Sequence, residues 1–492
     1  MSMIRVTDLT FAYPGSYDHI FEHASFQFDT DWKLGFTGRN GRGKTTFLRL
    51  LAGELSHDGA IIGGVPCGYF PPPVTDEDRL TLEVMEAACP AAEEWELLRE
   101  AGLLEVDGEV LYRPFSTLSN GERTKVLLAA LFCGEDRYLL IDEPTNHLDA
   151  RARKVTAEYL RKKRGFLLVS HDRDLLDGCV DHMMALNKTG VEVVNGTFSS
   201  WWENKARKDA FEQAKNDHLQ KELRRLRQAA ERTAVWSEQV EATKIGSRNS
   251  GLRPDRGYIG HKSAKMMRRA KSLDQRRQKA VEEKKSLLLD LERADVLKLH
   301  PLTARGRLLD LKDVILSYGE RTVCGPLTFA VEPGDRVALD GANGCGKSTL
   351  LKFLCGEAGM DDTGGLTRLS GLTVSVVPQD TSFLKGSLRD FARESQVDET
   401  LLLAILRKLD LSRVQFEKDL ADWSAGQRKK ALLARSLCQS AHLYVWDEPL
   451  NYMDVWSRMQ VEALLLTYRP TMLFVEHDGA FRRNIATRVV QM

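Results

Sequence analysis

An internal duplication is the feature that most constrains how this chain can fold. Residues 38–45 and 341–348 both match the pattern G-x-x-x-x-G-K-[ST], and Lys44 and Lys347 within them lie 303 residues apart. Three later motifs recur at offsets of 305 or 306 residues. A nearly constant offset over this length indicates two copies of one structural unit. The 492-residue chain is therefore expected to contain two similar domains rather than one large core.

Each copy has the residue pattern of an α/β domain. Short apolar runs such as Leu139-Leu140-Ile141 and Phe166-Leu167-Leu168-Val169 alternate with helix-like stretches. This alternation is typical of a largely parallel sheet covered by helices. We predict one such domain at residues 1–197, a second at residues 307–492, and a linker at residues 198–306 between them.

The glycine-rich segments are typical of phosphate-binding loops. Glycines let backbone N–H groups close around phosphates, the lysine pairs with the outer phosphates, and the final Ser or Thr ligates Mg²⁺. The candidate nucleotide-binding residues of the first loop are Gly38, Asn40, Gly41, Gly43, Lys44, Thr45 and Thr46. Those of the second loop are Gly341, Asn343, Gly344, Gly346, Lys347, Ser348 and Thr349. The expected ligands are ATP and Mg²⁺.

Two neighbouring carboxylates follow an apolar run in each copy. They are Asp142 and Glu143 in the first copy and Asp447 and Glu448 in the second. The first carboxylate of a pair can hold the Mg²⁺ shell together with the loop hydroxyl, and the second can orient or deprotonate the attacking water. This arrangement after a phosphate loop predicts ATP hydrolysis.

A serine-containing motif precedes a predicted helix in each copy. The motifs are Leu118-Ser119-Asn120-Gly121-Glu122 and Trp423-Ser424-Ala425-Gly426-Gln427. A hydroxyl and backbone amides at a helix N-terminus can bind an anion such as a γ-phosphate, and an ordinary serine helix cap is the alternative. Both motifs resemble the L-S-G-G-Q signature of ATP-binding-cassette (ABC) ATPases, and the order of motifs in both copies matches that superfamily.

The resemblance implies roles for further residues at matching positions. His171 and His477 match the switch histidine, which makes them catalytic candidates beside the two glutamates. The remaining matches are the D-loop aspartates Asp149 and Asp454, the adenine-stacking tyrosines Tyr13 and Tyr318, and the Mg²⁺-binding Q-loop glutamine Gln379. For the tyrosines, a place in the core is the alternative. The first copy has Pro72 where that glutamine is expected, so two non-equivalent ATP sites are predicted.

In this superfamily, ATP lies between the phosphate loop of one copy and the signature of the other. The resemblance therefore implies two composite sites. One would combine Lys44, Thr45, Asp142, Glu143 and His171 with Ser424. The other would combine Lys347, Ser348, Gln379, Asp447, Glu448 and His477 with Ser119. The two copies of one monomer would then close on ATP and reopen after hydrolysis, as a clamp.

Charge is unevenly distributed along the chain, although its net value is zero. Residues 201–300 contain 25 Lys and Arg against 15 Asp and Glu, and residues 241–280 contain 12 against 3. Apolar residues recur with helical spacing from about 198 to 240 and again from about 262 to 297. We predict an antiparallel helical hairpin on the order of 60 Å long, with a basic tip at about 241–262.

The tip carries residues suited to phosphate and to stacking on an exposed base. These residues are Lys244, Arg248, Arg253, Arg256, Tyr258, His261 and Lys262. A local basic field indicates contact with a polyanion. The alternative is that the helices have merely solvated charged faces and the tip is an ordinary glycine-rich loop.

Three further features bear on the compartment. The sequence has no apolar run of about 18 residues that would cross a bilayer, and its N-terminus lacks a signal-peptide pattern. The eight cysteines show no metal-binding spacing. A cytoplasmic protein with reduced thiols and no membrane partner is expected.

Two cassettes joined by a helical hairpin, without a membrane segment, resemble the ABC-F family. The tip resembles its antibiotic-resistance, ribosome-protection branch, particularly the Lsa-type proteins. This resemblance implies binding to the bacterial ribosome in the exit-site region, near 23S rRNA and the P-site tRNA. It also implies that the tip reaches toward the peptidyl-transferase centre and dislodges lincosamides, streptogramin A or pleuromutilins. Three alternatives are a housekeeping ABC-F translation factor, the ATPase subunit of a membrane exporter, and a nucleotide-gated module that never hydrolyses ATP.

Overall fold

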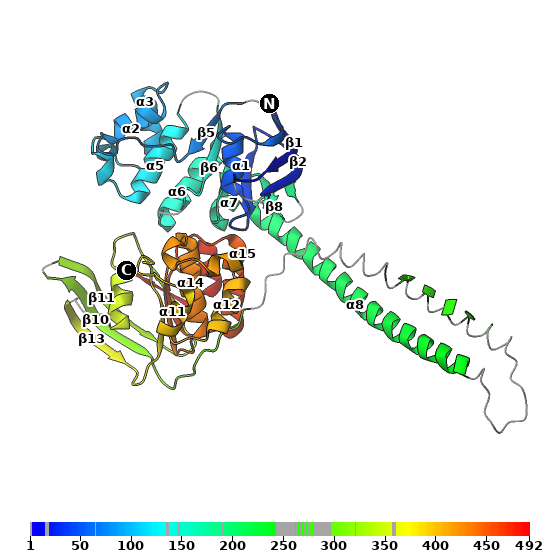
Figure 1. Cartoon of the computed structure of the whole chain (residues 1–492). Helices are drawn as coiled ribbons and strands as arrows, with labels where there is room; N and C mark the ends of the chain where they lie inside the picture. Colours follow the sequence, from blue (N-terminus) through cyan, green and yellow to red (C-terminus); the bar gives the residue numbers. More distant parts are fainter. Residues whose placement is uncertain are drawn as a thin grey trace, which may run out of the picture. The chain divides into compact units, whose positions relative to one another are not determined.

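The computed structural model describes most of the chain. The described residues are 2–14, 19–63, 65–133, 137–145, 148–187, 190–242, 297–319, 321–356 and 361–492, with several residues between 261 and 278. Two compact units divide the chain. Residues 1–186, 190–199 and 294–492 form the first unit, and residues 187–189 and 200–293 form the second. The first unit contains both copies of the duplicated sequence, which we call the first domain (residues 2–197) and the second domain (residues 307–492) (Figure 1).

The first domain is built on a six-stranded sheet with the order β5-β6-β7-β3-β8-β9. These strands are β5 Cys67–Phe70, β6 Tyr138–Asp142, β7 Phe166–Val169, β3 Lys33–Gly38, β8 His182–Leu186 and β9 Val191–Asn195. All neighbours are parallel except β8 and β9. A separate antiparallel sheet contains β2 Phe21–Asp29, β1 Met3–Phe11 and β4 Asp58–Ile62.

The second domain repeats this arrangement. Its parallel sheet has the order β14-β15-β16-β12-β17, and its antiparallel sheet has the order β11-β10-β13. The strands are β14 Val374–Val377, β15 Leu443–Asp447, β16 Met472–Val475, β12 Arg336–Asp340, β17 Arg488–Gln491, β11 Arg321–Val331, β10 Leu309–Tyr318 and β13 Asp361–Arg368. The prediction of two α/β nucleotide-binding domains is therefore confirmed.

Helices connect and cover the sheets in both domains. Those of the first domain are α1 Lys44–Leu51, α2 Thr81–Ala88, α3 Glu94–Leu103, α4 Gly108–Leu111, α5 Asn120–Leu131, α6 Ala150–Arg161 and α7 Arg173–Cys179, with the 3-10 helix η1 Phe115–Thr117. Those of the second are α10 Lys347–Cys355, α11 Leu388–Glu394, α12 Glu399–Lys408, α13 Arg413–Phe416, α14 Ala425–Cys438, α15 Val455–Tyr468 and α16 Gly479–Ile485, with η3 Leu420–Asp422.

Burial explains why the central strands read as uninterrupted apolar runs. Every residue of β7 and β16 is buried, as expected for parallel strands that are covered on both faces. The second domain has two apolar clusters, of which one contains Phe474 and Phe481 and the other Val337 and Leu350. These packed layers fix the strand ends, and the predicted site residues follow those ends.

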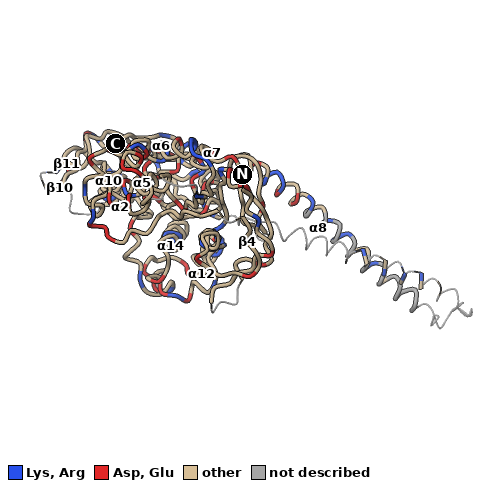
Figure 2. The backbone as a smooth tube through the Cα atoms, turned by 90° about the horizontal axis from the view of Figure 1, so that it is seen from above, with Lys and Arg blue, Asp and Glu red and all other residues tan. Residues whose placement is uncertain are grey.

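The linker begins with one long helix, α8 Phe198–Ala242, which has 45 residues. Figure 2 shows Lys and Arg recurring along the described length of α8. Of the predicted tip residues, only His261 is described, and it is helical. Lys244, Arg248, Arg253, Arg256, Tyr258 and Lys262 lie outside the described residues. Within the described ranges, none of the helices combines the length and the apolar character needed to cross a membrane.

Candidate ATP-binding sites

Both phosphate loops connect a central strand to a helix, β3 to α1 and β12 to α10. Gly43 and Gly346 stand just before the helices with φ of 96° and 95°, in the left-handed region that favours glycine. A Cβ at Gly43 would lie 2.2 Å from Ile20 Cγ2, and one at Gly346 would lie 2.9 Å from Cys324 Cβ. Glycine is therefore required at both positions by the backbone and by the space available.

The loop lysines point back onto their own loops. Lys44 Nζ donates to the carbonyl oxygens of Gly38 and Arg39 at 2.7 and 3.2 Å. Lys347 Nζ donates to the carbonyl oxygens of Gly341 and Ala342 at 2.7 and 2.8 Å. Each ammonium group therefore lies within its own phosphate loop and donates hydrogen bonds to the carbonyl oxygens of that loop.

The two catalytic candidates Glu143 and Glu448 follow β6 and β15 in the same unusual conformation. Their φ angles are 48° and 47°, and their backbone N–H groups donate to Val169 O and Val475 O at 2.9 Å each. A non-glycine residue at positive φ costs free energy, so its occurrence at both strand ends indicates a constraint of the site. The positive φ thus occurs at the same place in both domains, directly after the aspartate that ends the strand.

The histidines relate to these glutamates differently in the two domains. His477 Nε2 lies 3.2 Å from Glu448 Oε1. Burial opposes ionisation of Glu448, but His477, Gln379 and Lys429 together outweigh it, so the pKa of Glu448 is below its usual value. His171 Nε2 instead lies 3.0 Å from Asn40 Oδ1 and 3.5 Å from Glu143 Oε1.

The first-domain glutamate is accordingly the weaker acid. Burial and the neighbouring charge of Asp142 raise the pKa of Glu143 to about 7. Burial also lowers the pKa of His171 well below its usual value, and the charge of Lys44 adds to this effect. The predicted non-equivalence of the two halves thus has a counterpart in the protonation of their carboxylates.

The aspartates that end β6 and β15 each lie beside the hydroxyl of the phosphate loop, but their further neighbours differ. In the first domain, Thr45 Oγ1 and the Tyr69 hydroxyl both donate to Asp142 Oδ2, at 2.8 and 3.1 Å. In the second domain, Ser348 Oγ donates to Gln379 Oε1 at 3.5 Å. Burial raises the pKa of Asp447. Sequence reasoning missed Tyr69, although it stands only three residues before Pro72.

Both signature serines cap helices. Ser119 Oγ accepts from the Glu122 backbone N–H at 3.3 Å and donates to the Glu122 carboxylate at 2.7 Å. Ser424 Oγ accepts from the Gln427 N–H at 3.3 Å. The capping role considered as the alternative is thus present in both copies, and it leaves the remaining helix N–H groups directed outward.

A cavity of about 860 Å³ is lined by the residues of one predicted composite site, except for Asp447. From the second domain it is lined by Asn343, Gly344, Gly346, Lys347, Ser348, Thr349, Gln379, Glu448 and His477, and from the first by Ser119, Gly121, Glu122 and Asp149. The structure thus brings the second phosphate loop and the first signature together. Glu105, Val106 and Asp107, which the sequence did not single out, also line it.

The tyrosines predicted to stack on adenine occupy unlike surroundings. Tyr13 shares a hydrogen bond of 3.1 Å with Thr46 Oγ1, and its ring meets Phe11 edge-on at 5.1 Å. Tyr318 is 49% exposed at the end of β10. Val323, on the neighbouring strand β11, lines the cavity. Both tyrosines are exposed, and neither is among the residues that line the cavity, so stacking on adenine stays a prediction.

The first phosphate loop contacts two parts of the second domain. Arg39 Nη1 lies 3.2 Å from Asp410 Oδ1, and a second contact comes from the segment between Glu448 and Asp454. Asn40 Nδ2 donates to Tyr452 O at 3.0 Å. Asp454 caps α15 by accepting from the Ser457 N–H at 2.9 Å, and its carboxylate lies 3.4 Å from Lys430 Nζ. Asp149, the equivalent residue of the first domain, caps α6 in the same way by accepting from the Ala152 N–H at 2.8 Å.

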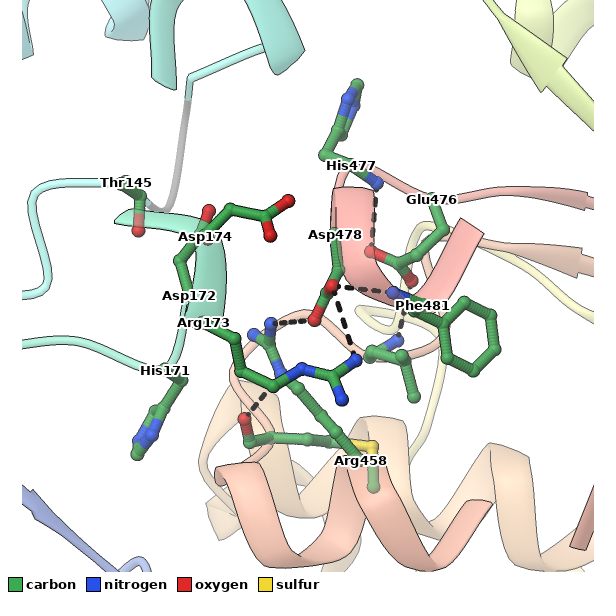
Figure 3. A network of polar contacts seen from close by, with 12 residues as sticks. Thr145, His171, Asp172, Arg173, Asp174, Arg458, Glu476, His477, Asp478 and Phe481 are labelled. Atoms are coloured by element: carbon green, nitrogen blue, oxygen red, sulfur yellow. Dashed lines mark hydrogen bonds and ion pairs between the residues drawn. The ribbon is translucent and has the colours of Figure 1, made fainter. Parts of the chain in front are cut away.

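A buried network of charges joins the two domains next to the histidines (Figure 3). Arg173 of the first domain donates to Glu462 Oε2 at 2.9 Å and lies 3.5 Å from Asp478 Oδ1. Arg458 also donates to Asp478, at 3.3 Å. Arg173, Arg458 and Asp478 are all buried. The motifs gave no signal for this network, except that Arg173 and Asp478 each stand within two residues of a predicted switch histidine.

One carboxylate oxygen in each half has no hydrogen-bond partner within the described residues. Among the described residues, Glu143 Oε1 and Asp447 Oδ1 are buried oxygens without a hydrogen-bond partner. The described part of the chain contains no group of three His, Cys, Asp or Glu residues that could hold a metal by itself. This is the donor set expected of a Mg²⁺ site, where one or two carboxylates act together with phosphate oxygens and water.

The comparisons with known proteins agree with this geometry. A family model described as ABC transporter matches residues 21–146 and 324–451. The chain is 27% identical over 484 residues to the ribosome protection protein VmlR of Bacillus subtilis (strain 168), which covers 97% of this chain and 84% of that protein. It is 25% identical over 530 residues to the energy-dependent translational throttle protein EttA of Haemophilus influenzae, with 96% and 89% covered.

Solved structures show the same fold. The archaeal ribosome recycling factor aABCE1, solved in complex with the archaeal ribosomal stalk protein aP1, aligns with a TM-score of 0.64 at 19% identity, covering 98% of this chain and 87% of that one. The segments that match the family model account for just over half of the chain and include both phosphate loops. The chain therefore belongs to the ABC transporter family, and it is an ATPase of the ABC-F type.

Proposed function

We propose that this protein binds the bacterial ribosome in its ATP-bound state and protects it from antibiotics of the peptidyl-transferase centre. The observation that carries the proposal is the full-length similarity to a relative named as a ribosome protection protein. A basic linker supports it, because a local excess of Lys and Arg favours contact with RNA phosphates. Lincosamides, streptogramin A and pleuromutilins are the drug classes concerned, and the cytoplasm is the site of action.

We assign the ATP chemistry to two composite sites. Lys44 and Lys347 pair with the outer phosphates after leaving the loop carbonyls that they contact in this structure. Glu143 and Glu448 accept the proton of the attacking water, while His171 and His477 hold the site through Asn40 and Glu448, respectively. Ser119 and Ser424 contact the γ-phosphate from the opposite domain. Tyr13 and Tyr318 stack on the adenine rings.

Mg²⁺ would be held by Thr45 and Asp142 in one site and by Ser348, Gln379 and Asp447 in the other. When bound, it neutralises charge on the phosphates. Closure brings Asp149 and Asp454 against the opposite phosphate loops, and hydrolysis lets the two domains separate. The segment from 198 to 306 is the linker whose tip, at about 241–262, reaches toward the peptidyl-transferase centre near 23S rRNA and the P-site tRNA.

The first experiment tests ribosome binding. A Glu143→Gln/Glu448→Gln double variant should remain in the closed ATP state and co-sediment with 70S ribosomes when ATP is present. A Lys44→Ala/Lys347→Ala variant is the matched control, because it lacks the lysines that pair with the phosphates. Equal recovery of both variants in the ribosomal pellet would contradict ATP-dependent binding.

The second experiment tests drug protection and uses a translation assay free of membranes. The wild-type chain should restore translation in the presence of a lincosamide or a pleuromutilin. A variant in which residues 246–260 are replaced by a short glycine linker should keep ATPase activity and lose protection. Unchanged protection by the trimmed variant would show that the tip is not the effector.

A housekeeping translation factor is the second candidate function, because the chain is also similar to a translational throttle protein. This candidate predicts ribosome binding without any change in drug inhibition. The same translation assay separates the two, since only a protection protein raises the drug concentration needed for half-maximal inhibition.

A further inference from the structure

The first domain lacks an amide side chain at the edge of its ATP site, where the second domain has Gln379. The strand registers define the equivalent positions. Phe70 of β5 pairs with Ile141, and Val377 of β14 pairs with Trp446, each just before the aspartate that ends the next strand. Two residues beyond these paired positions lie Pro72 in the first domain and Gln379 in the second. Proline has no side-chain oxygen or N–H group that could replace the amide.

A different side chain reaches the same place from inside the strand. The Tyr69 hydroxyl donates to Asp142 Oδ2 at 3.1 Å, and Thr45 Oγ1 donates to the same oxygen at 2.8 Å. Val376 is the equivalent of Tyr69 in the second domain, and it has no polar group. The contact with Asp142 is therefore specific to the first half.

The chemistry of the two side chains differs in kind. The Gln379 amide oxygen is an acceptor that can ligate a cation directly. Tyr69 is half-buried, and its hydroxyl acts as a donor, because a phenol is protonated at neutral pH and the oxygen that it contacts belongs to a carboxylate. A donor fixes the orientation of the carboxylate instead of joining the metal shell.

We propose that Tyr69 is the positioning residue of the first ATP site and replaces the missing Q-loop glutamine by orienting the Asp142 carboxylate toward the metal. The two sites of the chain thus meet the same requirement in different ways, one by a direct amide contact and the other by a hydrogen bond from a neighbouring strand. This inference rests on the metal role proposed above for Thr45 and Asp142.

The test measures how nucleotide binding at the first site depends on Mg²⁺. The full chain carries Lys347→Ala, so that a fluorescent ATP analogue reports the first site, and binding is titrated at fixed analogue over a range of Mg²⁺ concentrations. Removing a partner that orients a metal ligand typically weakens metal affinity by about 10- to 100-fold. Tyr69→Phe should therefore raise the half-maximal Mg²⁺ concentration by at least about tenfold, while binding in excess EDTA stays unchanged.

Tyr138→Phe is the matched control. Tyr138 lies on the adjacent strand β6, paired with Cys67, and its hydroxyl is buried without a hydrogen-bond partner among the described residues. The same substitution there should leave the Mg²⁺ dependence unchanged. Adding Pro72→Gln to Tyr69→Phe restores an amide at the position of Gln379 and should return the Mg²⁺ requirement toward the wild-type value. A double variant no better than Tyr69→Phe would overturn the equivalence with Gln379.

Two further experiments distinguish the role of Tyr69 from the proposed metal site of Thr45 and Asp142. In a Lys44→Ala background, where the analogue reports the second site, Tyr69→Phe should have no effect, and an equal shift there would refute a local role. Thr45→Val tests the metal site itself. If Thr45→Val shifts the Mg²⁺ requirement and Tyr69→Phe does not, the positioning role of Tyr69 is wrong while the metal site stands. If neither shifts it, the metal assignment is wrong as well.

Discussion

Arg173 offers the most direct test of how the two domains are held together. The Arg173 side chain is 9% exposed and contacts Glu462 and Asp478 of the other domain. Arg173→Met keeps much of the side-chain volume but removes the charge. Removing one partner of a buried ion pair leaves an uncompensated charge and typically costs about 3–5 kcal/mol.

The structure places the expected cost near the lower end of that range. Asp478 keeps Arg458 at 3.3 Å and a hydrogen bond from the Phe481 N–H, so only part of its compensation is lost. We therefore expect Arg173→Met to lower the free energy of unfolding by about 3 kcal/mol. The second domain cannot supply a reciprocal contact, because the equivalent of Arg173 is Gly479.

Arg483→Met is the control. Arg483 also pairs across the two domains, with Asp174, but the two side chains are 65% and 43% exposed. Exposed ion pairs contribute about 0–1 kcal/mol, so this variant should remain close to the wild type. Both variants should be compared by urea unfolding, monitored by tryptophan fluorescence. If Arg173→Met lowered the free energy of unfolding no more than Arg483→Met, the argument from burial would be refuted.

A double-mutant cycle isolates the contact itself. Arg173→Met and Glu462→Gln, separately and together, should give a coupling energy of about 1–3 kcal/mol, the upper range for residues in direct contact. If the effect of the double variant on the free energy of unfolding equalled the sum of the two single effects, the stability of the interface would arise elsewhere.

Three other outcomes are expected from the geometry. Burial lowers the pKa of Lys429 to about 8 from its usual value of 10.5, so between these pH values the folded chain binds fewer protons than the unfolded chain. The free energy of unfolding should therefore rise with pH, relative to that of Lys429→Met, by up to about 3 kcal/mol. Urea unfolding in EDTA from pH 7.5 to 10.5 measures this change, and a decrease with pH would contradict the prediction. Gly43→Ala should weaken ATP binding at the first site at least about tenfold, because the new Cβ would clash with Ile20 and the backbone has a positive φ. Gly53→Ala is the control, since Gly53 also has a positive φ, of 75°, but has open space around it. Equal ATP affinities of the two variants would contradict the steric argument. His477→Ala should slow single-turnover phosphate release at the second site by about 100-fold through loss of its contact with Glu448, whereas an unchanged rate would deny His477 a role in hydrolysis.

The sequence was sufficient for features that depend on local chemistry. Phosphate loops need glycine at positive φ and a lysine at a fixed spacing, and the apolar runs before Asp142 and Asp447 are buried strands because parallel strands are covered on both faces. These requirements act within a few residues, so a pattern can express them. The family resemblance, rather than local chemistry, located the departure of the first half at Pro72.

Features that depend on pairing between distant segments were not accessible in this way. The contact of Tyr69 with Asp142 spans 73 residues and follows from the register of β5 against β6. The contact of Arg173 with Glu462 spans 289 residues and depends on how the two domains meet. No local spacing encodes either distance. Glu105 and Asp107 reach the nucleotide cavity for the same reason, from a turn that carries no motif.

The departures from symmetry are connected rather than scattered. In the first half, Asn40 donates to the Tyr452 carbonyl and lies against His171, and burial together with the charge of Asp142 raises the pKa of Glu143. In the second half, His477 contacts Glu448 directly and lowers its pKa. A glutamate must be ionised to accept a proton from water, and the contact with His477 favours the ionised form of Glu448. In the first half, Asn40 holds both His171 and a carbonyl of the opposite domain. We therefore expect the surroundings of His171 to change with any movement of the two domains, whereas His477 contacts a glutamate of its own domain.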